Sequence, residues 1–271
     1  MNIRAVTALA LLLGLFACAG ARANSTEPLA GIPALPFTIV AKRAHDQYLF
    51  TQGMAFHGEL LIESGGNYRE SRVLVRDTEN LSPKMQQRLP ALWFGEGVAV
   101  QGDRAVVLTW RENVAQVYAL PALRPITRLR YVGEGWGLAW DGTHFIHSDG
   151  SERLLWRDAR DFSVRRSLTV RAAGAPLGML NELEWVEGRL FANVWLTDSV
   201  VVIDPSDGKV IARLDLSGLL RPAEKRRADV LNGIAWQASK RLLWVSGKHW
   251  PWMFALRLEL PAVSMRPDPP K

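Results

Sequence analysis

The chain has 271 residues, of which 48% are hydrophobic and 22% are charged, and its formal net charge is +6. This balance suits a single folded domain, and a charge of this size is too small to indicate a nucleic-acid-binding protein. The only cysteine is Cys18, so the chain has no second thiol for an internal disulfide, and a hydrophobic core must stabilise the fold.

The first 23 residues have the pattern of a secretory signal peptide. Arg4 precedes an apolar run over residues 5–17, and small residues follow up to Ala23, the expected cleavage site. The run is too short to span a bilayer, so we expect no transmembrane segment. A second interpretation is lipidation of Cys18, which ranks lower because Phe16 is bulky for such a site. The sequence therefore predicts an exported chain, with residues 24–36 as a linker.

Five repeats follow, and each begins with a short motif. The first residue of the motif is polar or a tryptophan, and in four of the five repeats the second residue is glycine. The motifs start at positions 52, 96, 136, 181 and 232 and read QGMAF, EGVAV, WGLAW, NELEW and NGIAW. Their spacings of 44, 40, 45 and 51 residues are close to the length of one four-stranded blade. The period therefore predicts a β-propeller with five blades.

Each motif is the first strand of a predicted β-hairpin. A polar turn follows it, then a second apolar run such as residues 105–110, and then a third candidate strand such as residues 114–118. The last repeat has room for only three strands before the proline-rich tail at 261–271, whereas residues 37–41 form an apolar strand before the first repeat. We therefore expect an all-β, five-bladed propeller of four-stranded antiparallel blades over residues 37–260, closed by the N-terminal strand in the last blade.

Equivalent positions of the five repeats lie on one ring around the axis of a propeller, because the innermost strand of each blade lines the channel. The ring consists of Gln52, Glu96, Trp136, Asn181 and Asn232. The second strand is antiparallel to the first, so its end returns to the same rim and brings five more residues there. These are Glu63, Trp110, Ser148, Trp195 and Lys248. A few convergent polar groups among indoles are typical of a small-ligand site.

Two ring residues receive different interpretations. A carboxylate at Glu96, held among Phe94, Trp110 and Trp136, loses hydration, which raises its pKa toward neutrality and suits a proton carrier. Asn232 stands beside a glycine at a strand start, where an amide side chain most often bonds to backbone groups. We therefore assign chemistry to Glu96 and a structural role to Asn232.

Other patterns carry less weight. His144 and His147 are three residues apart, which on a strand sends their rings to opposite faces, so they are not a metal-ligand pair. The basic run at residues 225–227 is typical of a solvated surface loop. The sequence contains no zinc-protease, CxxC, P-loop or nucleophile-elbow pattern. It therefore offers no motif for a metal, a nucleotide cofactor or a nucleic acid.

Nine short motifs together resemble one family. They are FTQG at 50–53, FGEG at 94–97, LTW at 108–110, GWGL at 135–138, SDGS at 148–151, LNELEW at 180–185, NVWLTD at 193–198, DVLNGIAW at 229–236 and GKHWP at 247–251. In this order they resemble the glutaminyl-peptide cyclotransferases of the plant and bacterial propeller type, over residues 50–252. A departure lies at residues 63–69, ESGGNYR, where the family usually has an EST-G-x-Y-G pattern, and it is expected to alter a loop at the mouth.

The resemblance implies an enzyme that cyclises the N-terminal glutamine of peptides or proteins to pyroglutamate and releases ammonia, without a metal or other cofactor. It implies Gln52, Glu96, Asn181 and Lys248 as catalytic groups, with Glu96 as the proton shuttle. The implied substrate-binding residues are Phe50, Phe94, Trp110, Trp136 and Trp195. We also expect a monomer that is periplasmic or secreted, in keeping with a bacterial signal peptide.

Two other functions stay open at this point. A metal-dependent propeller hydrolase, similar to a lactonase, would use Glu96, Asn181 and Asn232 as oxygen ligands of a divalent cation, although such enzymes resemble six-bladed propellers. A non-catalytic propeller would bind peptides as a scaffold, since a fold alone does not determine a function. Chelator-sensitive turnover would favour the first, and binding of Gln-peptides without ammonia release would favour the second.

Overall fold

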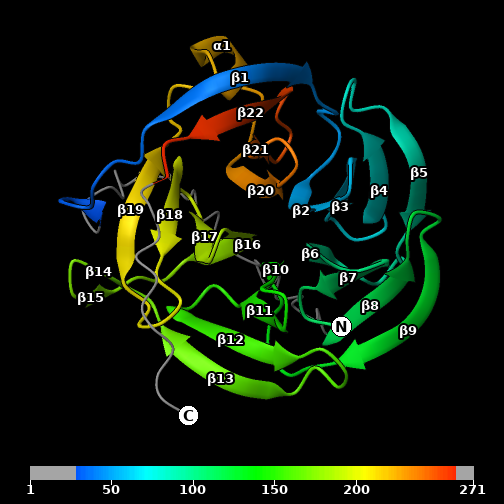
Figure 1. The fold of residues 1–271 in the computed structure, drawn as a ribbon. Helices are drawn as coiled ribbons and strands as arrows, with labels where there is room; N and C mark the ends of the chain where they lie inside the picture. Colours follow the sequence, from blue (N-terminus) through cyan, green and yellow to red (C-terminus); the bar gives the residue numbers. More distant parts are fainter. Residues whose placement is uncertain (1–28, 261–271) are drawn as a thin grey trace, which may run out of the picture.

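The computed structural model describes residues 29–260, so the predicted signal peptide and the proline-rich tail lie outside the described residues. These residues form five four-stranded antiparallel sheets around one axis, with strands β2, β6, β10, β16 and β20 nearest to the centre (Figure 1). Within this part of the chain, no helix has the length and hydropathy needed to cross a membrane. The prediction of an all-β, five-bladed propeller is confirmed.

The five sheets are called blades 1 to 5 in chain order, and their strands are given from the axis outward. Blade 1 consists of β2 (Thr51–His57), β3 (Leu60–Gly65), β4 (Arg72–Asp77) and β5 (Pro83–Arg88). Blade 2 consists of β6 (Gly95–Gln101), β7 (Arg104–Thr109), β8 (Val114–Ala119) and β9 (Arg124–Arg130). Blade 3 consists of β10 (Leu138–Trp140), β11 (His144–Ser148), β12 (Arg153–Asp158) and β13 (Val164–Thr169).

Blade 4 consists of β16 (Leu180–Val186), β17 (Arg189–Val194), β18 (Ser199–Ile203) and β19 (Val210–Asp215). Blade 5 consists of β20 (Leu231–Gln237), β21 (Leu242–Gly247), β22 (Trp252–Leu258) and β1 (Phe37–Ala44). Two small elements lie between blades: the hairpin of β14 (Arg171–Ala172) and β15 (Ala175–Pro176), and the single-turn helix α1 (Pro222–Lys225). The helix falls within residues 216–228, the basic segment that precedes blade 5.

The N-terminal strand closes the ring. β1 pairs antiparallel with β22 along its whole length, from Phe37 opposite Leu258 to Ala44 opposite Trp252, and the two strands lie side by side in Figure 1. The outermost strand of the last blade therefore comes from the start of the fold, as the sequence predicts. Such closure ties the two ends of the propeller together and leaves no unpaired edge between blades 1 and 5.

The repeated glycine is required because the inner strands approach one another closely. A Cβ atom at Gly53 would lie 2.5 Å from the backbone nitrogen of Val98, and one at Gly97 would lie 2.7 Å from that of Leu138. Such distances leave no room for a side chain. Glycine in the motif therefore sets how tightly the blades meet at the axis.

In the fourth repeat Glu182 stands where the other four have glycine. Its carboxylate is fully buried and reaches two other blades: Oε1 accepts a hydrogen bond from the backbone N–H of Met54 (3.1 Å) and Oε2 from that of Ile234 (2.9 Å). These N–H groups belong to β2 and β20. One side chain of blade 4 therefore links blades 1 and 5 across the centre.

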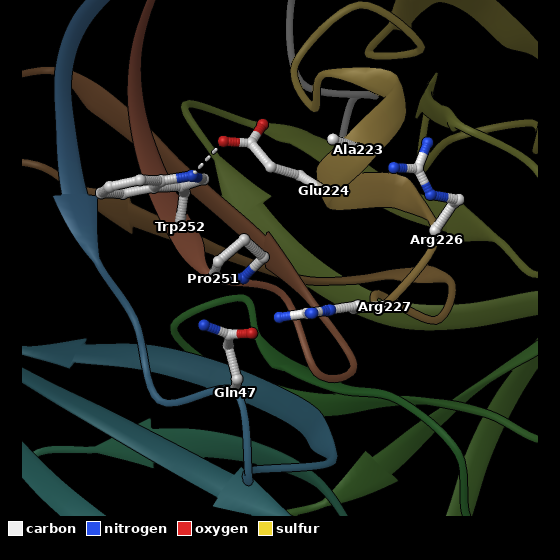
Figure 2. A pocket seen from close by; sticks show the side chains of 7 residues that line it. All are labelled: Gln47, Ala223, Glu224, Arg226, Arg227, Pro251 and Trp252. Atoms are coloured by element: carbon white, nitrogen blue, oxygen red, sulfur yellow. Dashed lines mark hydrogen bonds between the residues drawn. The ribbon is translucent and has the colours of Figure 1, made fainter.

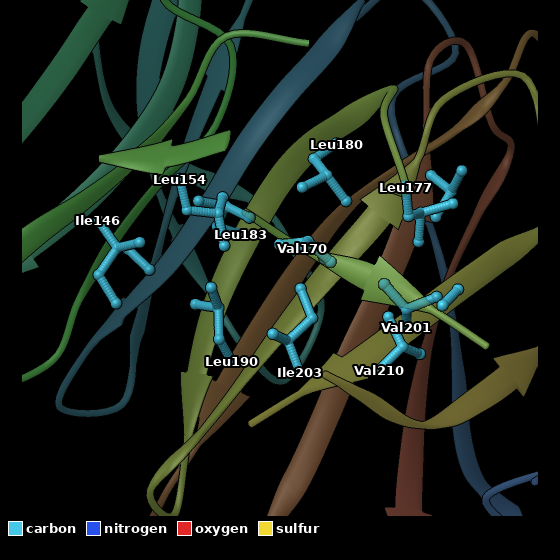
Figure 3. Close-up of a cluster of buried hydrophobic side chains, with 14 of the residues drawn as sticks. Ile146, Leu154, Val170, Leu177, Leu180, Leu183, Leu190, Val201, Ile203 and Val210 are labelled. Atoms are coloured by element: carbon cyan, nitrogen blue, oxygen red, sulfur yellow. The ribbon is translucent and has the colours of Figure 1, made fainter. Parts of the chain in front are cut away.

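Hydrophobic clusters fill the space between neighbouring blades. Five such clusters occur among the described residues, one for each pair of adjacent blades. Figure 3 shows the cluster between blades 3 and 4, with Ile146 and Leu154 facing Leu183, Leu190 and Val201. Burial of this apolar surface is the main force holding the blades together. Three indoles of the inner strands also pack against these clusters; they are Trp140, Trp185 and Trp236.

Part of the expected linker packs on the propeller. Leu29 and Leu35 are buried in the clusters on the two sides of blade 4, and Ala34 forms a parallel bridge with Arg213 of β19. The segment from residue 29 therefore contributes to the core before β1 begins.

Candidate active site

Three of the predicted ring residues are joined by hydrogen bonds across blades. Gln52 at the start of β2 donates from Nε2 to Oε1 of Glu96 on β6, at 2.9 Å. Asn232 of β20 donates from Nδ2 to the carbonyl oxygen of Gln52 at 3.1 Å and to its Oε1 at 3.2 Å. The inner strands of blades 1, 2 and 5 therefore bring these side chains together, although they lie up to 180 residues apart in the sequence.

Asn181 occupies the equivalent position on β16 of blade 4. Its side chain is 3% exposed, and its Oδ1 has no hydrogen-bond partner among the described residues. A buried amide oxygen without a donor is costly, so this atom is an acceptor that an N–H group of a ligand can satisfy. The backbone carbonyl of Asn181 instead accepts a 2.6 Å bond from Ser148 Oγ, which fixes the strand start.

Five half-buried aromatic residues, called here the aromatic arc, are connected along the same rim. Its members are Phe50, Phe94, Trp110, Trp136 and Trp195. The ring centroids of Phe50 and Phe94 are 6.1 Å apart, and those of Phe94 and Trp110 are 5.7 Å apart. Trp136 and Trp195 meet edge to face at 5.4 Å. The arc runs from blade 1 to blade 4 and offers apolar surface for a ligand's aliphatic part.

Glu134 joins the two halves of the arc. Its Oε2 accepts hydrogen bonds from the indole nitrogens of Trp110, at 2.8 Å, and Trp136, at 3.0 Å. Arg111 holds the other oxygen at 2.9 Å. Glu134 was not identified from the sequence; the signal that could have found it is an acidic residue two positions before a rim tryptophan.

Lys248 contacts the blade 1 end of the aromatic arc from the side of blade 5. Its side chain is buried, and Nζ lies 4.6 Å from the centre of the Phe50 ring, a cation–π contact. Burial lowers the pKa of Lys248 below its usual range, opposed by the charges of Glu96 and Asp229. The loop that carries it is fixed by two backbone bonds, from Lys248 N to Val230 O and from Asp229 N to Lys248 O.

Glu96 is a buried carboxyl with a single direct hydrogen-bond partner. Desolvation raises its pKa well above the usual value of 4.5, while the charge of Lys248 lowers it and the charges of Glu134 and Glu112 raise it. Gln52 is the only side chain bonded to it among the described residues. A carboxyl in these surroundings, with its pKa raised by burial and lowered by a nearby ammonium group, can serve as a group that takes up and releases a proton.

Two residues expected at the rim turn inward instead. Glu63 is fully buried in blade 1, bonded to His45, Thr51 and Arg76. Ser148 is also buried, and its Oγ accepts a bond from the Gly137 N–H. The strand ends do return to this rim as predicted, but alternate residues of a strand face opposite sides, and these two side chains pack within the blades.

The departure loop at residues 63–69 contributes to the arc through Tyr68. Its ring meets Phe94 edge to face at 5.4 Å, and its hydroxyl donates to Glu112 at 3.1 Å. Tyr68 was not singled out from the sequence. The contact shows that this loop reaches the mouth and contributes an aromatic surface there.

Glu96 is not the only carboxyl with a raised pKa: burial also raises the pKa of Glu182 and that of Glu184, which lies on the axis away from the arc. Burial raises the pKa of Glu184, near the far end of β16, to about 8. It lines a small cavity with Phe56, Trp140 and Trp236, at the opposite end of the inner strands from Glu96. A raised pKa alone therefore does not distinguish Glu96 from the other two carboxyls; the polar and aromatic neighbours of Glu96 do.

This chain is similar to known proteins in both sequence and fold. A family model described as glutamine cyclotransferase matches residues 9–258. A glutaminyl-peptide cyclotransferase of Arabidopsis thaliana is 35% identical over 226 residues, which cover 82% of this chain and 71% of that protein. The crystal structure of the glutaminyl cyclase of Myxococcus xanthus matches with a TM-score of 0.76 and 31% identity, covering 85% of this chain and all of that one.

Proposed function

Because this chain belongs to the glutamine cyclotransferase family, we propose that Glu96 is the proton carrier in the cyclisation of N-terminal glutamine. The chain is an enzyme with glutamine cyclotransferase activity: it converts an N-terminal glutamine of a peptide to pyroglutamate and releases ammonia. Neither the metal-dependent hydrolase nor the scaffold interpretation receives support from the comparisons. The assignment of roles to individual residues is our proposal.

The reaction joins the α-amine nitrogen to the Cδ carbon of the same residue and breaks the bond from Cδ to the amide nitrogen. Glu96 first takes a proton from the α-ammonium group, which leaves the amine free to attack. The Glu96 carboxyl then returns this proton to the amide nitrogen, which departs as ammonia, and the excess proton on the ring nitrogen passes to the freed carboxylate. One carboxyl therefore acts as base and then as acid.

The raised pKa of Glu96 suits this cycle. In the free enzyme, burial favours the neutral carboxyl. A bound α-ammonium group would place a positive charge beside it, which favours ionisation and so drives the proton from the carboxyl before the reaction begins. Gln52, bonded to Oε1, holds the carboxyl in one orientation.

The polar neighbours have separate tasks. The unpaired Oδ1 of Asn181 accepts an N–H group of the substrate. Lys248 follows the second strand of blade 5, and Glu96 lies on the first strand of blade 2. From there the Lys248 ammonium group stabilises the negative charge that develops on the oxygen bonded to Cδ. The aromatic arc packs on the aliphatic part of the glutamine and keeps its amine close to its own amide, and such positioning can supply much of the rate of an intramolecular reaction.

The observation that carries this assignment is the buried carboxyl of Glu96, bonded only to Gln52 and next to the aromatic arc. The test is replacement of Glu96 by Gln, with ammonia release followed for a Gln-initiated dipeptide. We expect kcat to fall by about 100-fold or more. The matched control is E184Q, because Glu184 is also an axial carboxyl with a raised pKa, although it is only half-buried. Activity of E96Q within a few-fold of E184Q would remove Glu96 from this role.

The location of the enzyme follows from residues outside the described part of the chain. We propose that residues 1–23 are a signal peptide, that residues 24–36 precede a catalytic propeller over residues 37–260, and that the mature enzyme is a monomer in the periplasm or secreted. N-terminal sequencing of the purified mature protein tests this: a start at Asn24 supports it, whereas a lipidated Cys18 or an intact Met1 would contradict it. Sedimentation measures the mass.

A further inference from the structure

The segment between blades 4 and 5 forms one wall of a cleft on the active-site rim. The cleft has a volume of about 430 Å³ and is shown in Figure 2. It is lined by Gln47, Ala223, Glu224, Arg226, Arg227, Pro251 and Trp252. These residues come from the stretch before β2, from helix α1 and its end, and from the loop between β21 and β22. All three segments lie at the rim where β2 and β20 begin.

A chain of contacts links this cleft to the proposed active site. Phe50 of the aromatic arc contacts His249 at 5.4 Å between ring centres, and His249 bonds through Nδ1 to the backbone oxygen of Gln47 at 2.9 Å. Lys248 precedes Pro251 by three residues, so their Cα atoms are at most about 11 Å apart. The cleft is therefore the next surface beyond Lys248 on the blade 5 side.

The cleft carries uncompensated positive charge. Arg226 and Arg227 are both exposed, and among residues 29–260 neither side chain has a hydrogen bond or ion pair. The carboxylate of Glu224 is already engaged, by Arg221 at 2.8 Å and by the indole of Trp252 at 2.8 Å. In Figure 2 the Arg227 side chain points toward Gln47 and Pro251. Two guanidinium groups are thus free to bind an anion.

The opposite side of the mouth carries two carboxylates. There Glu134 holds the indoles of Trp110 and Trp136 and is paired with Arg111 at 2.9 Å, whereas Glu112 accepts from Tyr68. A peptide chain leaving the site therefore meets Glu112 and the paired Glu134 on the side of blades 1 to 3, and unpaired guanidinium groups on the side of blade 5. This field favours a substrate whose negative charge follows the glutamine toward blade 5.

We propose that Arg226 and Arg227 form a subsite for a carboxylate carried by the peptide substrate a few residues after its N-terminal glutamine. The inference rests on the proposed function, because the glutamine must occupy the arc for the chain to enter the cleft. An extended peptide advances about 3.3–3.6 Å per residue, so the third or fourth residue spans the distance from Lys248 to the cleft. Arginine suits this task because its planar group binds carboxylates in a bidentate manner.

The carboxylate can come from an Asp or Glu side chain or from the C-terminus of a short peptide. Both present the same group, and the substrates of the test separate them. The first series is Gln-Ala-Xaa-Ala amide with Xaa as Asp, Asn or Lys, together with the same change at the fourth position. The second compares Gln-Ala-Ala as the free acid and as the amide.

The measured quantity is the ratio of kcat/KM for the Asp peptide to that for the isosteric Asn peptide. For the wild-type enzyme we expect a ratio of about 5 to 10 at low salt, falling toward one at high salt. In R226E/R227E the ratio should fall below one. The matched control is R104E/R124E, which reverses the same charges at exposed positions on the opposite rim, where β7 and β9 begin, and it should keep the wild-type ratio.

A ratio near one in the wild-type enzyme would overturn the subsite, as would an unchanged ratio in R226E/R227E. An equal fall in R104E/R124E would also overturn it, because general surface charge would then explain the preference. Turnover of the neutral Asn peptide separates this proposal from the proposed function: if no peptide of either series releases ammonia, the cyclisation itself is refuted. Thermal unfolding of each variant shows that it is folded.

Discussion

Glu63 of blade 1 and Glu96 of blade 2 are both buried glutamates of inner hairpins, yet they have opposite ionisation behaviour. Burial raises the pKa of Glu63, but the charges of His45 and Arg76 and the bonds from His45 and Thr51 outweigh it and hold the pKa at about 2. For Glu96 the same desolvation dominates and the pKa rises well above 4.5. The difference lies in the partners: Arg76 is 2.5 Å from Glu63, whereas no cation of the described residues lies within 4.0 Å of Glu96.

The comparison shows how one fold separates stability from chemistry. A buried carboxylate that pairs with a cationic side chain, as Glu63 does with Arg76, stays ionised and stabilises its blade. A buried carboxyl whose only direct partner is an amide, as Glu96 with Gln52, can still exchange its proton. Its ionised form then lowers the stability of the folded state. The predictions below change one partner or one carboxyl at a time.

The largest effect is expected for E63Q. The folded-state pKa of Glu63, about 2, lies below the ordinary 4.5, so its ionised form stabilises the fold above pH 4.5, and this contribution is lost as the pH falls toward 2. At pH 7 the free energy of unfolding should fall by about 3 kcal/mol. Chemical denaturation of wild type and E63Q between pH 3 and pH 7 measures the difference, which should be largest above pH 4.5 and shrink below it.

E96Q is the counterpart of E63Q. A raised folded-state pKa means that ionisation opposes folding, so the stability from neutral Glu96 is present below pH 4.5 and is lost as the pH rises through the folded-state pKa. At pH 7 E96Q should therefore be as stable as wild type or more stable. If E63Q and E96Q both lose stability at pH 7, the contrast between the two carboxyls is wrong.

The fold was predictable because its signals are local and repeated. Five motifs at blade-length spacing specify the number of blades, and the count of strands in the last repeat specifies closure by the strand predicted at residues 37–41, which extends to Ala44 in the structure. The motif requires glycine because a side chain at Gly53 or Gly97 would clash with the backbone of the next blade, and only the structure shows this. The exception in the fourth repeat, Glu182, was visible in the alignment of repeats as an acid in a glycine's place, but the groups that bind it lie on other blades.

The site was predictable as far as the repeat register reaches. Gln52, Glu96 and Asn232 meet because they are equivalent positions. Partners outside the register were not predictable: Glu134 comes from a loop before β10, and Arg76, which neutralises Glu63, comes from the third strand of its blade. Their roles depend on side-chain distances between elements, which a repeat pattern does not contain. The basic run at residues 225–227 likewise could be proposed as part of a substrate subsite only once the structure placed it beside the active-site rim.

The next effect in size is on the pH profile of K248M. The charge of Lys248 lowers the pKa of Glu96, so its removal should move the acid limb of kcat/KM, which reports the free enzyme, up by about one pH unit. K248R, which keeps the charge, should restore the limb toward its wild-type position. The control is K240M, which removes a lysine from the turn before β21 on the opposite rim. A limb that stays in place in K248M, or moves equally in K240M, would show that Lys248 does not act on Glu96.

The smallest effect is expected for E134Q, and it should have the opposite sign. After desolvation and Lys248, the negative charge of Glu134 is the next influence on Glu96, and it raises the pKa; without it the acid limb should move down, by less than it moves up in K248M. A neutral amide also binds the indoles of Trp110 and Trp136 more weakly than a carboxylate does, so KM for a Gln-dipeptide should rise about three-fold to ten-fold while kcat changes less. E187Q, on the opposite rim, removes the same charge and should leave both quantities at their wild-type values. Opposite shifts in K248M and E134Q would place Glu96 between the two charges as the titrating group; shifts in the same direction would assign the acid limb to another group.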